Sequence, residues 1–91
     1  MSNQKHLLLY GVVQGVNLRY LIQNEANRRK ICGFVKNSSD GSVEVLAIGE
    51  ARELDNLILW ISMGPGQSKI KEIKKISRPS MTKFDDFQIL Y

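Results

Sequence analysis

Two stretches with helical periodicity alternate with runs that are typical of β-strands, and this alternation constrains the fold more than any other feature of the chain. The helical stretches are "LRYLIQNEANRRK" and "ARELDNLILWISM". Each places apolar residues on one stripe, as a helix packed on one side requires. The stripes consist of Leu18, Leu21, Ile22 and Ala26 in the first helix and Leu54, Leu57, Ile58 and Ile61 in the second.

Four shorter runs have β character without ambiguity: "HLLLYGVV", "GFVKN", "SVEVLAI" and the closing "FQILY". The first is apolar on both faces, which predicts a central strand. The second and third flank "SSDG", and an Asp-Gly pair between two extended runs predicts a hairpin, because Gly accepts positive φ without steric strain. "GPG" at Gly64 to Gly66 is expected to end the second helix.

"KIKEIKKIS" is ambiguous, because Ile70, Ile73 and Ile76 recur every three residues. This spacing suits a helix better than a regular strand. A strand with a bulge near Glu72 would also place the three isoleucines on one face. We favour the strand, since the stretch directly follows a helix stop.

The resulting order is β-α-β-β-α-β, two split βαβ units of the α+β class. Such units pack as an antiparallel sheet with both helices on one face. A chain of 91 residues can build one compact core, so we expect a single domain over residues 1–91.

The composition disfavours several classes of function. Apolar residues make up 43% and no run approaches the length of a membrane span, nor does the start resemble a signal peptide. One cysteine, Cys32, fits a reducing cytoplasm, and a single His with a single Cys offers no metal-ligand spacing. The net charge of +4 favours an anionic partner. Nucleic acid is disfavoured, because the basic runs lack interleaved aromatic residues.

"GVVQGVNLR", residues Gly11 to Arg19, joins the first strand to the first helix. The amides of Gly15, Val16, Asn17 and Leu18 fall in a tight turn and at a helix N-terminus, where successive N–H groups can form an anion-binding concavity. Arg19 could add two parallel donors to a phosphate. From spacing alone, a plain glycine turn with an exposed arginine explains these residues equally well. The Gly-Lys-Ser/Thr ending of a Walker loop is missing.

Two longer motifs make the interpretation specific. "LYGVVQGVNLR" (Leu9 to Arg19) resembles the first signature of the acylphosphatase family, and "GFVKNSSDGSVEVLAIG" (Gly33 to Gly49) resembles the second. "MGPGQSKIKEI" and the terminal "FDDFQILY" are similar to the family's later segments. The resemblance implies a ferredoxin-like fold and hydrolysis of small-molecule acyl phosphates without metal or other cofactor. It implies that the amides of Gly15 to Leu18 and Arg19 hold the phosphoryl group, while Asn37 positions the attacking water.

The sequence departs from the family at two places. Leu18 replaces a Phe or Met, and Lys30-Ile31 replaces a Gly-Leu pair whose glycine would suit a left-handed helix cap. His6 is expected at the surface and Trp60 at the edge of the core. We therefore predict a cytoplasmic, monomeric acylphosphatase. The alternatives are a ferredoxin-like module that binds phosphate or RNA without catalysis, and a scaffold that has lost turnover.

Overall fold

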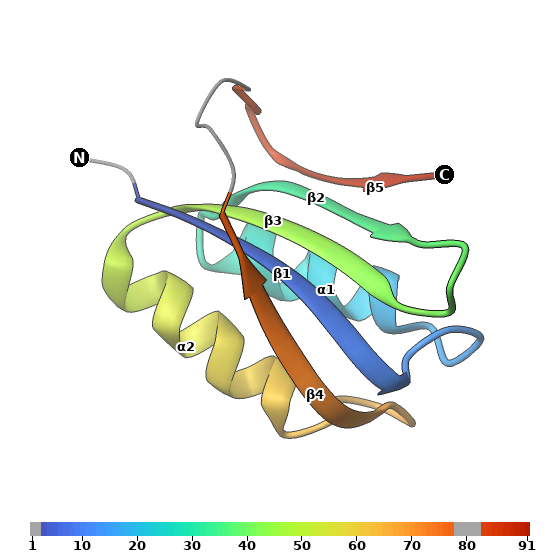
Figure 1. Ribbon diagram of the computed structural model, residues 1–91. Coiled ribbons are helices and arrows are strands. Elements are labelled where there is room, and N and C mark those ends of the chain that lie inside the picture. Colours follow the sequence, from blue (N-terminus) through green and yellow to red (C-terminus); the bar gives the residue numbers. More distant parts are fainter. Residues whose placement is uncertain (1–2, 78–82) are drawn as a thin grey trace.

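The computed structural model describes residues 3–77 and 83–91. The predicted β-α-β-β-α-β order is confirmed, and the closing run "FQILY" adds a fifth strand after it (Figure 1). The elements are β1 (Asn3–Val12), α1 (Leu18–Arg28), β2 (Cys32–Asn37), β3 (Val43–Gly49), α2 (Ala51–Ser62), β4 (Lys69–Ile76) and β5 (Phe87–Leu90). Within the described residues, no helix is both long enough and apolar enough to cross a membrane.

The five strands form one sheet in the order β4-β1-β3-β2-β5. β1 pairs antiparallel with β3 and β4, and β2 pairs antiparallel with β3. β5 lies parallel to β2, so the sheet expected to be antiparallel is mixed. Both helices cover the same face of the sheet, as the predicted sandwich requires (Figure 1).

The ambiguous segment 69–76 is a strand, and the predicted bulge is present. Tyr10 faces Glu72 while Gly11 faces Ile70, which leaves Lys71 as an extra residue on β4. The bulge turns Ile70 and Ile73 toward the core, where both are partly buried. Ile76 does not share this face, because it is three positions from Ile73 in a regular stretch of strand, and it is 37% exposed. The expectation of three isoleucines on one face is therefore wrong for Ile76.

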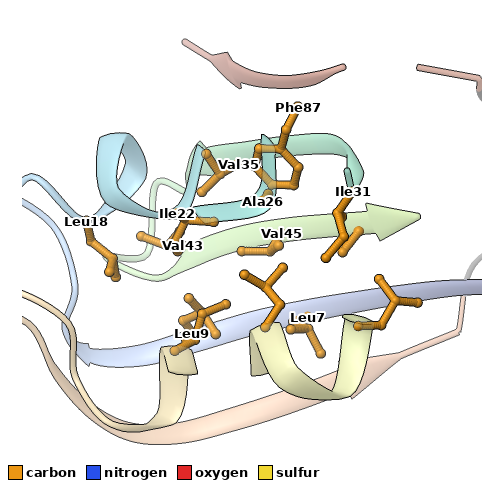
Figure 2. Packing of buried hydrophobic residues seen from close by; sticks show 14 of the residues in the cluster. Leu7, Leu9, Leu18, Ile22, Ala26, Ile31, Val35, Val43, Val45 and Phe87 are labelled. Carbon is orange, nitrogen blue, oxygen red and sulfur yellow. The ribbon is translucent and has the colours of Figure 1, made fainter. Parts of the chain in front are cut away.

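The core lies between the helices and the sheet (Figure 2). Leu7 and Leu9 of β1 lie opposite both helices and are fully buried. Each such side chain contributes roughly 1.5–3 kcal/mol by leaving water. The predicted stripes are confirmed at Leu18, Ile22 and Ala26 of α1 and at Leu54, Leu57 and Ile61 of α2. Trp60 packs against the edge of this core, as expected.

His6 is not the surface residue that the sequence predicted, because it is only 9% exposed. It lies on the sheet face away from the helices, next to Phe34, whose ring it meets edge-on at 6.5 Å. Its Nε2 is 2.6 Å from Oε2 of Glu44. The strand register brings together two residues that are 38 positions apart in sequence, which periodicity alone does not reveal.

The two helices both end on a left-handed residue, but the residue type differs. In α1, Ile31 N–H donates to Ala26 C=O and Lys30 N–H to Asn27 C=O, the two bonds of a Schellman cap. Lys30 adopts the left-handed conformation that this cap needs, with φ 58°. In α2 the corresponding residue is Gly64, with φ 70°, and its N–H donates to Ile61 C=O. The departure at Lys30 thus leaves the cap geometry intact.

Candidate active site

Four segments meet at one end of the sheet: the loop after β1, the start of α1, the end of β2 and the end of β5 (Figure 1). They enclose a hollow of about 410 Å³. It is lined by Val13, Gln14, Gly15, Asn17, Leu18, Arg19, Tyr20, Asn37, Ile89 and Tyr91. The fold therefore brings the end of the first signature next to Asn37 of the second.

Five of the six predicted site residues line this hollow: Gly15, Asn17, Leu18, Arg19 and Asn37. Val16 is not among the lining residues, and its side chain packs partly buried against the core. Any part that Val16 plays toward a ligand would therefore come from its backbone amide. Leu18 is almost fully buried, so the residue that replaces a Phe or Met fills the core behind the loop.

The loop backbone has the shape of an anion-binding turn. Gly15 has φ 74° and Asn17 has φ 62° and ψ 21°, so two left-handed residues lie within three positions. Such alternation points neighbouring N–H groups into one concavity. Gly15 supplies its conformation without steric strain, and Asn17 is the residue type that tolerates it best after glycine.

The N-terminus of α1 adds further positive potential. Among the described residues, no side chain caps this helix through a hydrogen bond, and its first turn contains no acidic residue. The first amides of a helix lack partners within it, and together they carry roughly half a positive charge. Since Leu18 and Arg19 of this turn line the hollow, the uncompensated charge faces it.

Arg19 carries the formal charge of the hollow, since the other lining residues are neutral. Its Nη1 makes a long hydrogen bond of 3.5 Å to the carbonyl of Leu90. Its guanidinium carbon lies 5.0 Å from the ring centroid of Tyr91. The carbonyl of Leu90 in β5 and the exposed ring of Tyr91, the residue after β5, therefore lie on one side of the guanidinium. The sequence offered no signal for Tyr91 beyond its alternation with Phe87 and Ile89.

Asn37 is the last residue of β2 and its side chain borders the hollow. Its Oδ1 is buried and accepts no hydrogen bond from the described residues. A buried acceptor without a partner is destabilising by about 1–3 kcal/mol. Asn37 therefore retains unused hydrogen-bonding capacity beside the loop.

Gln14 is a further polar residue of this site that sequence reasoning did not single out. Its Nε2 donates to the carbonyls of Ser38 and Ser42, both at 2.9 Å. These carbonyls belong to the turn between β2 and β3. A lone polar side chain within the apolar run "VVQGV" is the signal that could have identified it.

The turn itself has the geometry predicted from its Asp-Gly pair. Ser38 N–H donates to Ser42 C=O at 2.9 Å, and Gly41 N–H donates to Ser38 C=O at 3.2 Å. The Asp40 carboxylate accepts from the hydroxyl and the backbone N–H of Ser42. The hydroxyl bond is the main reason that the pKa of Asp40 lies below its ordinary value.

The hollow thus combines backbone donors, one guanidinium and one amide side chain, a set suited to a small phosphate or carboxylate. Across residues 3–77 and 83–91, no three His, Cys, Asp or Glu side chains gather as a metal site would need. Cys32 is a free thiol on β2 and does not line the hollow.

Comparisons with known proteins agree with this geometry. The acylphosphatase family model matches residues 5–89. The acylphosphatase of Pasteurella multocida is 34% identical over 88 residues, which cover 97% of this chain and 98% of that protein. The acylphosphatase of Bacillus subtilis is 38% identical over 88 residues, 97% of each chain. The crystal structure of acylphosphatase from Bacillus subtilis superposes with a TM-score of 0.90 at 37% identity, covering 100% of both chains.

Proposed function

Because this chain belongs to the acylphosphatase family and is a hydrolase of acyl phosphates, we propose that the hollow at the start of α1 is where the reaction takes place. One observation carries this assignment. Arg19, the left-handed turn around Gly15 and the amide of Asn37 come from separate segments and line a single hollow. The sequence separation of these groups makes their meeting a property of the fold.

In this proposal the phosphoryl group lies on the backbone amides of Gly15, Val16, Asn17 and Leu18. Arg19 donates two parallel hydrogen bonds to its oxygens. The positive end of α1 adds to the attraction, and the absence of an acidic residue from the first turn of this helix supports the assignment. Val16 takes part through its amide alone, since its side chain belongs to the core.

Asn37 positions the attacking water. Its Oδ1 accepts a hydrogen bond from that water, and an amide carbonyl can do so without being a base. Oδ1 is buried and has no partner among the described residues, so this acceptor is free to take the bond from the water.

The chemistry then needs little covalent help. The water oxygen forms a bond to phosphorus, the bond from phosphorus to the acyl oxygen breaks, and the carboxylate leaves with the electron pair. One water proton passes to a phosphate oxygen of the substrate. What remains for the protein is alignment and stabilisation of charge on the equatorial oxygens. A single well-placed donor of this kind is typically worth about 10²- to 10³-fold in rate.

The experiment that tests the proposal measures hydrolysis of benzoyl phosphate in the presence of a metal chelator. We expect rapid turnover by the unmutated protein and its loss in folded Arg19→Ala and Asn37→Ala variants. If the unmutated protein binds inorganic phosphate at Arg19 without turnover, the alternative of a non-catalytic phosphate-binding module is correct. If both variants remain fully active, the site lies elsewhere.

The proposal includes a monomer in the cytoplasm. The free thiol of Cys32 is compatible with a reducing compartment. Light scattering of the purified protein and fractionation of cells test these two points. We do not favour an RNA-binding role, because Tyr10 and Phe34 are the only Phe, Tyr or Trp residues on the central strands β1, β3 and β2.

A further inference from the structure

We propose that Gln14 is a positioning residue, which holds the β2–β3 turn, and with it Asn37, in register with the phosphate-binding loop. This inference rests on the proposed function, in which Asn37 holds the attacking water. It adds a component that neither Arg19 nor Asn37 supplies. The separation between the bound phosphoryl group and the water is set by a third side chain.

The contacts of Gln14 span the mouth of the turn. One amide group donates to the carbonyl of Ser38, which directly follows Asn37, and to the carbonyl of Ser42 on the returning side. Both bonds measure 2.9 Å and reach 24 and 28 residues along the chain. An amide nitrogen has two hydrogens, so both donors are used.

The two carbonyls lie close together because hydrogen bonds within the turn close it. The carbonyl of Ser42 also accepts from Ser38 N–H, and that of Ser38 also accepts from Gly41 N–H. Each oxygen therefore receives one bond from the turn itself and one from Gln14. Gln14 consequently stabilises the closed turn and ties it to the loop with the same two bonds.

The sheet provides this link only indirectly, through β3. β1 and β2 are not neighbours, because β3 lies between them. The loop that leaves β1 and the end of β2 are therefore not directly joined by strand pairing. Among the hydrogen bonds of residues 3–77 and 83–91, those of Gln14 are the ones that join the loop to the turn. Without them, Asn37 is related to the loop through β3, because Asn37 pairs with Val43 and Val43 pairs with Leu9 of β1, and through side-chain packing.

Such a link affects the reaction more than binding. The amides of the loop and Arg19 would still hold the phosphoryl group if Gln14 were lost. The water on Asn37 would no longer be held in line with the breaking bond, and a misplacement of about 1 Å can lower a rate by about 10²-fold. Loss of Gln14 should therefore lower kcat far more than it weakens the affinity for phosphate.

The test compares Gln14→Met with Asn37→Ala and with the double variant. Methionine keeps the length of the side chain and removes both donors. We expect Q14M to lower kcat for benzoyl phosphate by about 10- to 100-fold. The inhibition constant of inorganic phosphate should stay within about twofold, since its donors are unchanged. In the N37A background, Q14M should lower kcat no further, because the side chain that binds the attacking water is already absent.

Gln23→Met is the matched control. Gln23 on α1 also donates its amide to a backbone carbonyl, that of Phe87 on β5, at 3.1 Å. Its loss removes a similar bond without touching the link between loop and turn, so kcat should be unchanged. Melting temperatures establish that each variant is folded at the assay temperature.

Gln14→Glu serves as a second variant should Q14M not fold. An ionised carboxylate would face two carbonyl oxygens and break the link, whereas the protonated form can donate one bond. The kcat of Q14E should therefore recover in part as the pH falls through the pKa of the new carboxyl. A purely structural role for Gln14 would not produce that pH profile.

Three results would overturn the inference while leaving the proposed function in place. The first is an unchanged kcat in folded Q14M while N37A is impaired. The second is that Q14M lowers kcat in the N37A background as much as it does in the unmutated protein. The third is a rise in the inhibition constant of phosphate in Q14M that accounts for its loss of activity. An inactive unmutated protein or a fully active N37A would overturn the proposed function, and this inference with it.

Discussion

The two helices begin alike in sequence and differently in surroundings. Each has an arginine as its second residue, Arg19 in α1 and Arg52 in α2. Arg52 is exposed, whereas Arg19 is half-buried and lines the hollow. Within the described residues, neither helix start has a side-chain cap. The first turn of α2 contains Glu53, while that of α1 contains no acidic residue.

The positive end of the α2 dipole is therefore partly compensated by an acidic side chain, whereas that of α1 is not. Glu53 opposes the positive end of α2 and also accepts a 3.0 Å bond from Arg29, near the end of α1. At the other end of the molecule, Arg19 adds positive charge to a helix start that is already positive. Such an arrangement is mildly unfavourable until an anion binds, and each charge–dipole contact is worth roughly 0.3–1 kcal/mol. Positive potential is thus concentrated where the proposed substrate enters.

The largest expected effect comes from replacing each of the two arginines, one at a time, with alanine. Arg19→Ala should lower kcat/KM for benzoyl phosphate by at least about 10²- to 10³-fold, because a donor to the phosphoryl oxygens is lost. Arg52→Ala removes the same charge from the same helix position and should leave the activity unchanged. Steady-state kinetics on both folded variants check this prediction. Similar losses in the two variants would show that general positive potential, and not the position of Arg19, drives the reaction.

Inorganic phosphate should stabilise the protein through the start of α1. At one hundred times its dissociation constant, the free energy of unfolding should rise by about 2.7 kcal/mol. Arg19→Ala should remove most of this gain at the same concentration, and Arg52→Ala none of it. Urea unfolding with phosphate, and with chloride at equal ionic strength, measures both. A gain of equal size in Arg19→Ala would place the anion elsewhere.

Much of this fold could be predicted, because its signals are local. The apolar stripes of α1 and α2, the Asp-Gly turn and the glycine that ends α2 each depend on residues within a few positions of one another. The bulge in β4 was predictable for the same reason, since the spacing of Ile70 and Ile73 requires one extra residue. Arg19 and Asn37 could be proposed as site residues because two signatures surround them.

The contacts that were missed join residues distant in sequence. Gln14 reaches Ser38 and Ser42, and Tyr91 lies over Arg19, through the packing of separate strands and loops. His6 was misplaced for the same reason: its burial depends on Phe34 and Glu44, which another pair of strands supplies. The parallel pairing of β5 also depends on where the chain returns after β4, which periodicity does not encode.

Gly15→Ala should destabilise the loop by about 1–2 kcal/mol, the strain of a side chain in the left-handed conformation. A Cβ on Gly15 would meet no atom within 4 Å, so this strain is the whole expected effect. Relief of the strain would re-aim the amides, and the inhibition constant of phosphate should rise. Thermal unfolding and phosphate inhibition measure the two consequences. Loss of stability far above this range would reveal a packing role for the loop.

Lys30→Gly should stabilise the protein by about 0.5–1 kcal/mol. The left-handed strain of Lys30 is relieved, and part of the gain is offset by the greater freedom of glycine in the unfolded chain. The reciprocal Gly64→Lys should be clearly destabilising, since a Cβ there would lie 2.8 Å from the carbonyl oxygen of Ser68. Denaturant unfolding of both variants tests the pair. Since neither residue lines the hollow, Lys30→Gly should not alter kcat.

The smallest expected effect concerns the region where α1 ends and α2 begins. Carboxylates accept hydrogen bonds from arginine side chains there. Glu25 accepts hydrogen bonds from Arg28 and Arg29, and that from Arg28 is the main reason that the pKa of Glu25 lies below its ordinary 4.5. A carboxyl with a lowered pKa in the folded state stabilises fully above its unfolded pKa. That contribution is lost as the pH falls through the folded value. Acid should therefore remove this contribution at the end of α1.

Melting temperatures measured between pH 6 and pH 3 test this expectation. The unmutated protein should lose stability as the pH falls below about 4.5, and Glu25→Gln should flatten the first part of that fall. Glu72→Gln, on the exposed edge strand β4, controls for the loss of one acidic charge. The start of α1 contains no carboxylate to titrate, so the phosphate-induced gain of Glu25→Gln should match that of the unmutated protein at pH 6. A smaller gain would mean that the two ends of α1 are energetically coupled.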